Sequence, residues 1–110
     1  MWGPSGDSGG KLLLDTGAAR SLVSRSFLSL LGYDLSIART RQRIITASGM
    51  ASAPELRVTR IIAIGRERLD FPLLCYDLPQ VLRVDGLLGL DFMRKYRLTV
   101  DFQNGFLSLR

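Results

Sequence analysis

From residue 11 onward, apolar residues come in short stretches that are broken by turn-forming residues. This pattern is typical of a compact, mainly β domain with one or two short helices, so the predicted fold class is all-β. The first predicted strand covers residues 11–14 and runs directly into Asp15-Thr16-Gly17. An acidic residue therefore stands at the end of an apolar strand.

A short helix is predicted after residue 24. The Ser24 hydroxyl can cap its N-terminus, and Phe27, Leu30 and Leu31 then share one face. Gly32 follows as a stop, because glycine readily adopts the left-handed conformation that ends many helices. We expect the helix to be short, with this apolar face turned toward the core.

The middle of the chain predicts a long hairpin over residues 44–64, with a small, polar tip at residues 47–50. A turn at residues 65–67 then leads to a further strand over residues 69–76. Pro72 lies within that strand and cannot donate a backbone hydrogen bond. We therefore expect the strand to lie at an edge or to begin late.

The clearest local signal is a C-terminal hairpin over residues 98–109. Its two strands meet across Asn104-Gly105, a pair preferred in two-residue type I′ turns because both positions need a positive φ. In that register the apolar cross-strand pairs are Phe102 with Leu107 and Val100 with Leu109. A two-stranded ribbon is barely stable alone, so we expect the core or a second subunit to cover this face.

Residues 1–10 are rich in glycine and serine and have no apolar periodicity. We expect a flexible leader or a cloning remnant there, followed by a single domain over residues 11–110. The string Gly6-Asp7-Ser8-Gly9-Gly10 is similar to the nucleophile loop of trypsin-like serine proteases. That chemistry needs a base for the serine proton, and the chain has no histidine. We interpret the string as part of the leader.

Composition limits the possible chemistry. The chain has 110 residues, of which 46% are hydrophobic and 23% charged, which is typical of one globular domain. Without histidine, Ser-His-Asp and Cys-His catalysis are excluded and the commonest zinc ligand is missing, so we expect no metal and no cofactor. The single cysteine, Cys75, lies among apolar residues and is interpreted as a buried, unreactive thiol.

The sequence shows no basic segment followed by an apolar run, and no stretch approaches the ~20 apolar residues of a membrane-spanning helix. A lone cysteine is common in reducing compartments. We therefore expect a cytoplasmic protein without a membrane partner. A fragment processed from a longer polyprotein would have the same features.

The net charge is +5, and thirteen of the fifteen basic residues are arginine. Arg39, Arg41 and Arg43 recur at a spacing of two, which places them on one face of a strand. Nucleic-acid binding would use such a face, but no aromatic residues alternate with the arginines to stack on bases. A solvated sheet face is therefore favoured, and no nucleic-acid partner is expected.

The strongest chemical signal is the segment Leu12-Leu13-Leu14-Asp15-Thr16-Gly17-Ala18. A carboxylate directly after three leucines is costly to desolvate, so it should be either strongly paired or used in a reaction. Alone, the segment is equally compatible with an aspartate that caps a turn. A second segment, Asp85-Gly86-Leu87-Leu88-Gly89-Leu90-Asp91-Phe92-Met93, places an apolar pair between glycines before a short amphipathic helix.

In this order and separation, the two segments resemble the retropepsin-like aspartic proteases, the family of retroviral and retroviral-like enzymes. Its members combine an Asp-Thr-Gly-Ala loop after an apolar strand with a late hydrophobic-hydrophobic-Gly strand and a short helix. The resemblance covers residues 11–110. It implies an acid protease fold whose subunit is a retropepsin-like closed β-barrel. It also implies an aspartic endopeptidase that hydrolyses a peptide or protein substrate.

The resemblance further implies roles for individual residues. Asp15 would be the catalytic carboxylate, in a loop completed by Thr16, Gly17 and Ala18. Two close carboxylates are needed to share one proton and activate a water, yet the chain has one such loop. A homodimer would supply the second across a two-fold axis. The other implied site residues are Ala47, Ser48, Gly49 and Met50 in a flap and Leu87 and Leu88 in the pocket wall.

The chain also departs from the retroviral pattern. Retroviral members have an acidic residue shortly after the catalytic loop and Gly-Arg after the late strand, where this chain has Ala19-Arg20 and Gly89-Leu90. We expect their ion pair to be lost or replaced here, and the pattern is more similar to that of the non-viral, prokaryotic-type members. The strand that usually precedes the Asp-Thr-Gly strand is also missing from the pattern. Two alternatives stay open: a catalytically inactive retropepsin-like module for dimerisation or peptide binding, and a small basic β domain that binds nucleic acid.

Overall fold

The structure is a computed structural model that describes residues 1–38, 40–46 and 49–110. Within those residues the chain consists mainly of strands with short helices, which confirms the predicted all-β class. The strands are β1 (Trp2–Gly3), β2 (Gly6–Asp7), β3 (Leu12–Leu14), β4 (Leu22–Val23), β5 (Thr40–Thr46), β6 (Gly49–Ala63), β7 (Arg66–Cys75), β8 (Gly86–Leu88), β9 (Leu98–Asp101) and β10 (Phe106–Leu109). The helices are α1 (Arg25–Leu30) and α2 (Leu90–Met93), with 3₁₀ turns η1 (Leu35–Ile37) and η2 (Gln80–Leu82).

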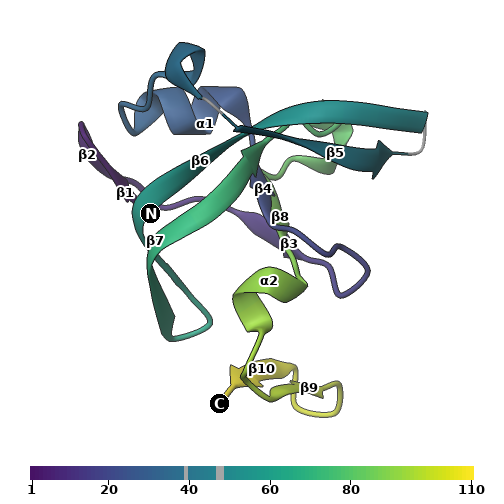
Figure 1. Cartoon of the computed structure of the whole chain (residues 1–110). Helices are drawn as coiled ribbons and strands as arrows, with labels where there is room; N and C mark the ends of the chain where they lie inside the picture. The colour runs from purple at the N-terminus through teal and green to yellow at the C-terminus, as the bar shows by residue number, and fades with distance from the viewer. Residues whose placement is uncertain (39, 47–48) are drawn as a thin grey trace.

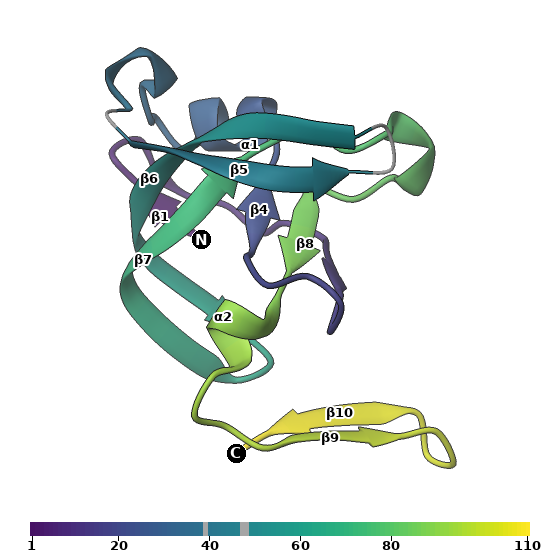
Figure 2. The ribbon, with the colours of Figure 1, turned by 45° about the vertical axis from the view of Figure 1, so that its right-hand side comes forward.

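Most strands belong to one sheet, in the order β2-β1-β6-β7-β4-β8-β3, with β5 paired to β6. The sheet curls into a half-barrel, and α2 lies between it and the C-terminal strands (Figures 1 and 2). The core is formed by buried side chains of β4, α1, β6, β7, β8 and α2, together with Leu109 of β10. Because β8 is inserted between β3 and β4, the late segment of the chain lies directly beside the early one.

The predicted long hairpin is present, since β5 pairs with β6 and β6 continues into its pairing with β7. The expectation that Pro72 marks an edge strand is wrong, because β7 lies between β6 and β4. Leu74 donates its amide to the Ser21 carbonyl on the β4 side, at 3.1 Å. The Pro72 nitrogen, two residues earlier, points to the same side before the pairing with β4 begins. Its missing donor therefore costs no hydrogen bond to β4.

Helix α1 begins at the predicted cap, where the Ser24 hydroxyl accepts a hydrogen bond from the Phe27 amide at 3.3 Å. Phe27 is buried as predicted, but Leu30 is 65% exposed and Leu28 is fully buried instead. A helix of six residues is too short for its own periodicity to fix the buried face. The strands that it packs against decide which side turns inward.

The N-terminal residues differ from the flexible leader expected for residues 1–10. Strands β1 and β2 form a small hairpin, and Trp2 pairs with Arg60 of β6. The Tyr33 hydroxyl donates to the Trp2 carbonyl at 2.7 Å and accepts from the Thr59 amide at 2.9 Å. The Arg60 guanidinium also lies 4.5 Å from the centre of the Trp2 ring. These tertiary contacts outweigh the turn-forming composition and add a strand ahead of β3.

Strands β9 and β10, here called the C-terminal ribbon, pair with each other and lie apart from the curled sheet (Figures 1 and 2). The predicted register is wrong. Leu107 faces Val100, so the connecting loop has four residues rather than two. Phe102 consequently leaves the apolar face and lies in the loop, where it is 91% exposed.

The ribbon's loop is shaped by Asp101. Its Oδ1 accepts hydrogen bonds from the Gln103 and Asn104 amides at 3.0 and 2.9 Å. Within the loop Gly105 has a positive φ and Asn104 does not, whereas a type I′ turn needs both. The observed register differs from the predicted one by two residues. Because side chains on a strand alternate with a period of two, the predicted apolar face is kept.

Candidate active site

Asp15 stands where β3 ends. Strand β3 runs parallel to β8, with Leu14 opposite Leu88, and the Asp15 amide donates to the Leu88 carbonyl at 3.0 Å. The Asp15 side chain is half-buried, and its Oδ1 accepts a hydrogen bond from the Gly17 amide at 2.9 Å. No hydrogen bond from the described residues reaches Oδ2. The carboxylate is therefore held through its backbone and one oxygen, which leaves the other oxygen available.

Two glycines let β8 approach its neighbours closely. A Cβ on Gly86 would lie 2.0 Å from the Leu22 carbonyl oxygen of β4. A Cβ on Gly89 would lie 2.7 Å from the carbonyl oxygen of Ala18, in the loop after Asp15. Any side chain at either position would therefore push β8 or the start of α2 away from the Asp15 loop.

A clamp of hydrogen bonds joins this loop to α2. The Asp91 carboxylate accepts from the Ser21 amide at 2.9 and 3.0 Å and from the Ser21 hydroxyl at 2.6 Å. Ser21 is fully buried, and its hydroxyl accepts from the Gly89 amide at 2.9 Å. The sequence analysis missed the clamp, because 70 residues separate Ser21 from Asp91 and no local pattern links them.

The clamp includes an ion pair. Arg20 Nε lies 3.5 Å from Asp91 Oδ2, and Arg20 Nη2 lies 3.2 Å from Glu55 Oε1 on β6. The ion pair expected here to be lost or replaced is therefore replaced, with the order of charges reversed. The basic residue now follows the Asp15 loop, and the acidic residue follows β8.

A cleft of about 670 Å³ opens beside Asp15. Asp15 is the one acidic residue among the described residues that line it. Much of the wall is apolar, with side chains from Leu22, Ile44, Leu74, Tyr76, Leu78 and Leu87. Two arginines, Arg20 and Arg43, also border the space. The arrangement places a single carboxylate at the side of a largely apolar channel.

The predicted loop and wall residues divide between the cleft and its support. Gly17 and Ala18 line the cleft, whereas Thr16 is exposed and is not part of the wall. Leu87 lines the cleft, while Leu88, only 3% exposed, lies behind it in the core. The sequence prediction did not separate lining residues from supporting ones.

The β5–β6 hairpin, defined here as Thr40–Thr46 and Gly49–Ala63, borders the cleft through residues 43–46 of β5. Met50, near the end of the hairpin, is 66% exposed. Two of the predicted flap residues, Ala47 and Ser48, lie outside the described residues. The predicted flap is therefore described through its two arms.

Two other residues named in the sequence analysis have structural places. Asp85 Oδ2 accepts from the Lys11 amide at 2.7 Å and so fixes the start of β3. Cys75 is buried in the core, and burial raises the pKa of its thiol. A raised pKa keeps the thiol protonated at neutral pH, in agreement with the interpretation of an unreactive cysteine.

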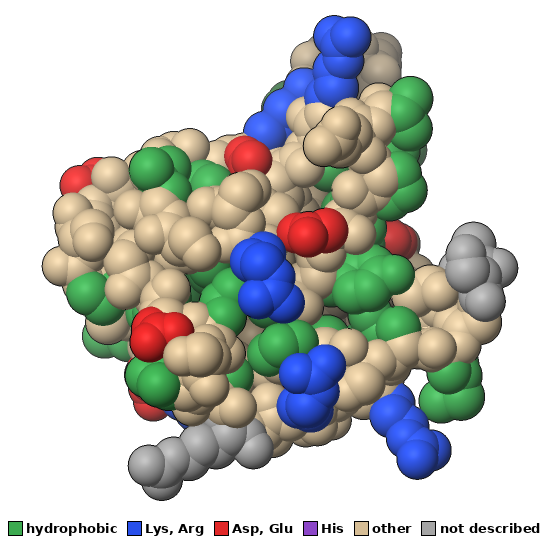
Figure 3. Space-filling model, turned by 90° about the horizontal axis from the view of Figure 1, so that it is seen from above, with side chains coloured by type: hydrophobic (Ala, Val, Ile, Leu, Met, Phe, Trp, Pro, Cys, Tyr) green, Lys and Arg blue, Asp and Glu red, His purple; other side chains and the backbone are tan. Residues whose placement is uncertain are grey.

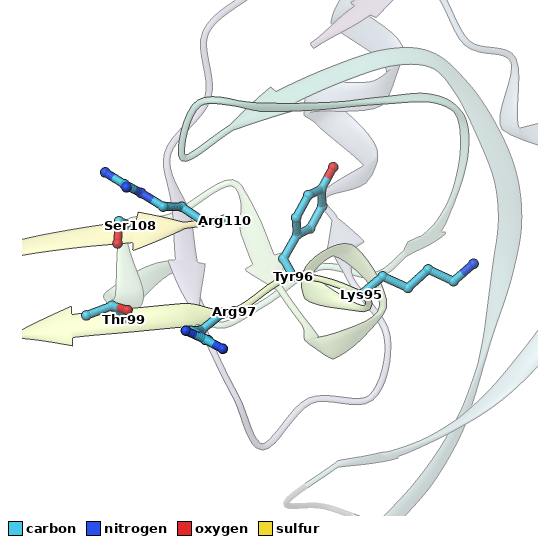
Figure 4. Close-up of a pocket in the computed structure, with 6 residues that line it drawn as sticks. All are labelled: Lys95, Tyr96, Arg97, Thr99, Ser108 and Arg110. Atoms are coloured by element: carbon cyan, nitrogen blue, oxygen red, sulfur yellow. The ribbon is translucent and has the colours of Figure 1, made fainter.

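A second hollow lies at the root of the C-terminal ribbon, away from Asp15 (Figure 4). It is lined by Lys95, Tyr96, Arg97, Thr99, Ser108 and Arg110. Figure 4 shows Lys95 and Arg110 extending in different directions, so the cationic groups do not converge on one point. The hollow also has no acidic side chain among its lining residues, and the candidate site remains at Asp15.

The arginines of β5 were expected on a solvated face. Arg41 and Arg43 are both exposed, and Arg41 donates to the Ser52 hydroxyl at 2.9 Å; Arg39 lies outside the described residues. The face that carries the hairpin shows its basic side chains spread singly, with apolar and polar surface between them (Figure 3). This face therefore has no continuous basic patch.

Metal sites and membrane spans require particular groupings of residues. Across residues 1–38, 40–46 and 49–110, no three or more histidine, cysteine, aspartate or glutamate side chains are grouped to hold a metal ion. No helix in the same part of the chain is both long and apolar enough to cross a membrane.

Comparison with known proteins gives matches of two kinds. A family sequence model described as "Aspartyl protease" matches residues 5–92. Among solved structures, the crystal structure of a retropepsin-like aspartic protease from Rickettsia conorii is similar, with a TM-score of 0.65 and 23% sequence identity. The match covers 87% of this chain and 69% of that one, and it confirms the predicted fold. A sequence search of curated proteins gave no match.

Proposed function

Because the chain belongs to the aspartyl protease family, we propose that it is an aspartic endopeptidase that works as a homodimer, with Asp15 of each subunit in one shared site. The observation that carries the proposal is the position of Asp15. It is the one acidic side chain on the described wall of a largely apolar cleft, in an Asp-Thr-Gly-Ala loop.

A second copy of the chain is needed because the acidic side chains near Asp15 already have partners. Asp85 accepts from the Lys11 amide, Asp91 accepts from Ser21, and Glu55 pairs with Arg20. None of the three lines the cleft. A second carboxylate therefore has to come from another subunit, and a two-fold axis through the site would supply a second Asp15.

In the proposed dimer the two Asp15 carboxylates share one proton, because two adjacent negative charges repel. The ionised carboxylate takes a proton from a bound water, whose oxygen attacks the carbonyl carbon of the peptide bond. The protonated carboxyl polarises the carbonyl oxygen, and a proton is then delivered to the nitrogen as the carbon–nitrogen bond breaks. Hydrolysis should therefore decline at both ends of the pH range, where the pair holds two protons or none.

The C-terminal ribbon supports a dimer independently. Leu109 at its root is buried in the core, but Val100 and Leu107 farther along the same face are each 41% exposed. A two-stranded ribbon with an open apolar face needs a cover. We propose that a second copy of this chain provides it.

The remaining site residues take roles consistent with their places. We propose that Thr16, exposed on the Asp15 loop, hydrogen-bonds to the loop of the other subunit. The hairpin tip, Ala47 to Met50, would close over a bound peptide and exclude water. Leu87 would contact substrate side chains, and Leu88 would support it from the core. Apolar residues are expected on either side of the cleaved bond, since most of the wall is apolar.

Mixed dimers test the proposal. Asp15→Asn keeps the size of the side chain, so it should preserve circular dichroism and dimerisation while lowering peptide hydrolysis by about 10³-fold or more. When wild-type and Asp15→Asn chains exchange freely, activity should follow the square of the wild-type fraction, because each site needs two carboxylates.

The protein concentration has to be controlled in this experiment. It has to stay well above the dimer dissociation constant, because dilution removes sites by mass action. A linear dependence on the wild-type fraction, with subunit exchange confirmed by labelled chains, would show that each chain has a self-contained site. Wild-type protein that dimerises and binds peptides but never cleaves them would instead favour the inactive module.

A further inference from the structure

Arg20, which follows the Asp15 loop and borders the cleft, forms ion pairs with two other elements of the molecule. Its guanidinium lies between Asp91 of α2, at 3.5 Å, and Glu55 of β6, at 3.2 Å. The Arg20 side chain is 31% exposed, whereas those of Glu55 and Asp91 are 17% and 10% exposed. The two carboxylates are thus largely withdrawn from water and are compensated by one cation.

Each carboxylate is also held by a second residue. Asp91 is held by the Ser21 amide and hydroxyl, as described for the clamp. Glu55 is held inside the β5–β6 hairpin, where its Oε2 accepts from Gln42 Nε2 at 3.1 Å. Arg20 therefore joins two preorganised partners, and the bond to Glu55 is a direct tie between the Asp15 loop and the hairpin.

Arg20 has few ways to satisfy its charge elsewhere. Its Nη2 is buried, and apart from the ion pair with Glu55 it makes no well-directed hydrogen bond to the described residues. Removing the Glu55 charge would leave this nitrogen without compensation in a partly desolvated place. The pair is therefore expected to resist displacement more than an exposed ion pair would.

We propose that Arg20 is a positioning residue that sets the height of the β5–β6 hairpin above Asp15. This proposal rests on the proposed function for its effect on catalysis, and its structural part stands independently. The pair acts at the base of the hairpin, where Glu55 faces Thr40, and the cleft-lining residues Ile44 and Thr46 follow on β5. Releasing the tie would let the hairpin close less accurately over a bound peptide.

Two substitutions test the tie, and Glu55→Gln does so without changing the clamp. Glu55→Gln removes the charge but keeps a side chain that can bond to Gln42, and Arg20 stays paired with Asp91. Arg20→Lys keeps the charge, but a single ammonium cannot span both carboxylates as a guanidinium does. Each should lower kcat/KM by about fivefold, mainly through a higher KM, and the double variant should be no worse than either alone.

The matched control is Arg57→Gln, which breaks the ion pair to Asp70 at 3.3 Å two residues farther along β6. That pair is well exposed, with side chains 59% and 75% accessible, so kcat/KM should stay within about twofold of wild type. Additive losses in the double variant, or an equal loss in Arg57→Gln, would overturn the proposal. A loss that disappears when the assay is cooled below the unfolding range would also overturn it, because general instability would then explain the effect.

Amide hydrogen exchange gives a readout that needs no catalysis. In Glu55→Gln, exchange should accelerate in residues 40–46 and stay unchanged at the Asp15 and Ala18 amides, which the β8 and loop hydrogen bonds protect. Arg57→Gln should leave residues 40–46 unchanged. If wild-type protein cleaves no peptide but the exchange pattern holds, the proposed function fails and the tie stands; unchanged exchange in Glu55→Gln refutes the tie.

Discussion

The Asp15 loop and the C-terminal ribbon are stabilised in opposite ways. The loop is held by distant parts of the same chain, through β8, the Ser21–Asp91 clamp and the Arg20 ion pairs. The ribbon is held mainly by its own ladder between β9 and β10, with part of an apolar face open to water. One region is supported from within the chain, and the other leaves part of an apolar face exposed.

In the proposed homodimer, this difference would let a half-site and a dimer contact coexist in a small domain. The internal, buried supports of Asp15 would place the carboxylate before a second subunit binds. The apolar face of the ribbon, partly exposed in the single chain, would be the surface that the second subunit covers. The following substitutions test the two regions separately.

The largest expected effect is on the Asp15 loop, through Gly86→Ala. A Cβ at Gly86 would lie 2.0 Å from the Leu22 carbonyl oxygen, which is backbone and cannot move aside cheaply. We expect the free energy of unfolding to fall by at least about 3 kcal/mol, measured by chemical denaturation. Gly9→Ala is the control, because nothing lies within 4 Å of a Cβ there, and its effect should stay within about 0.5 kcal/mol. Equal effects at both positions would contradict the close approach of β8.

A second test places a charge on each face of the C-terminal ribbon. Leu107→Glu lies on the apolar face opposite Val100, whereas Thr99→Glu lies on the polar face opposite Ser108. Burying a carboxylate against a second subunit is costly, so Leu107→Glu should weaken dimerisation by about tenfold or more. Thr99→Glu should change it little. Sedimentation velocity over a dilution series measures both, and equal dissociation constants would remove the ribbon from the dimer contact.

The smallest expected effect concerns the loop of the ribbon and pH. Hydrogen bonds from the Asn104 side chain and amide lower the pKa of the Asp101 carboxyl below its usual value. Because the pKa is lower in the folded state than in the unfolded state, these bonds stabilise the fold fully above the unfolded-state pKa. The stabilisation is lost as the pH falls through the folded-state pKa. The midpoint temperature of thermal unfolding should therefore be slightly higher for wild type than for Asp101→Ala at pH 6. The difference between the two midpoints should shrink toward pH 2. A difference that grows on acidification would reverse the assigned role of Asp101.

Local chemistry made much of the fold predictable. The start of α1 was predictable from Ser24, because a capping hydroxyl accepts a hydrogen bond from an amide only three residues later. The hairpin predicted over residues 44–64 followed from alternation of apolar and polar residues on its return arm. In these two cases the deciding residues lie close together in sequence. The Asp15 segment was different, because it became distinctive only together with the later segment at residues 85–93.

The errors arose where contacts across the chain decide the structure. The predicted two-residue turn at Asn104-Gly105 does not form, because hydrogen bonds to Asp101 stabilise a longer loop instead. A turn rule based on two residues does not include Asp101. Trp2 became part of the sheet through Tyr33, a residue 31 positions away. Nothing in the local sequence around Arg20 identifies its partner on β6.

The parallel pairing of β3 with β8 also governs when the site can form during synthesis and folding. Lys11 and Asp85, which join the two strands at their start, are 74 residues apart in the chain. A nascent chain that ends at β7 contains Asp15 but has neither β8 nor α2 to hold it. Contacts of such separation form slowly, because a long loop has to close before they contribute. The proposed protease therefore cannot present an ordered carboxylate until almost the whole domain has been made, which delays activity beyond the emergence of Asp15 itself.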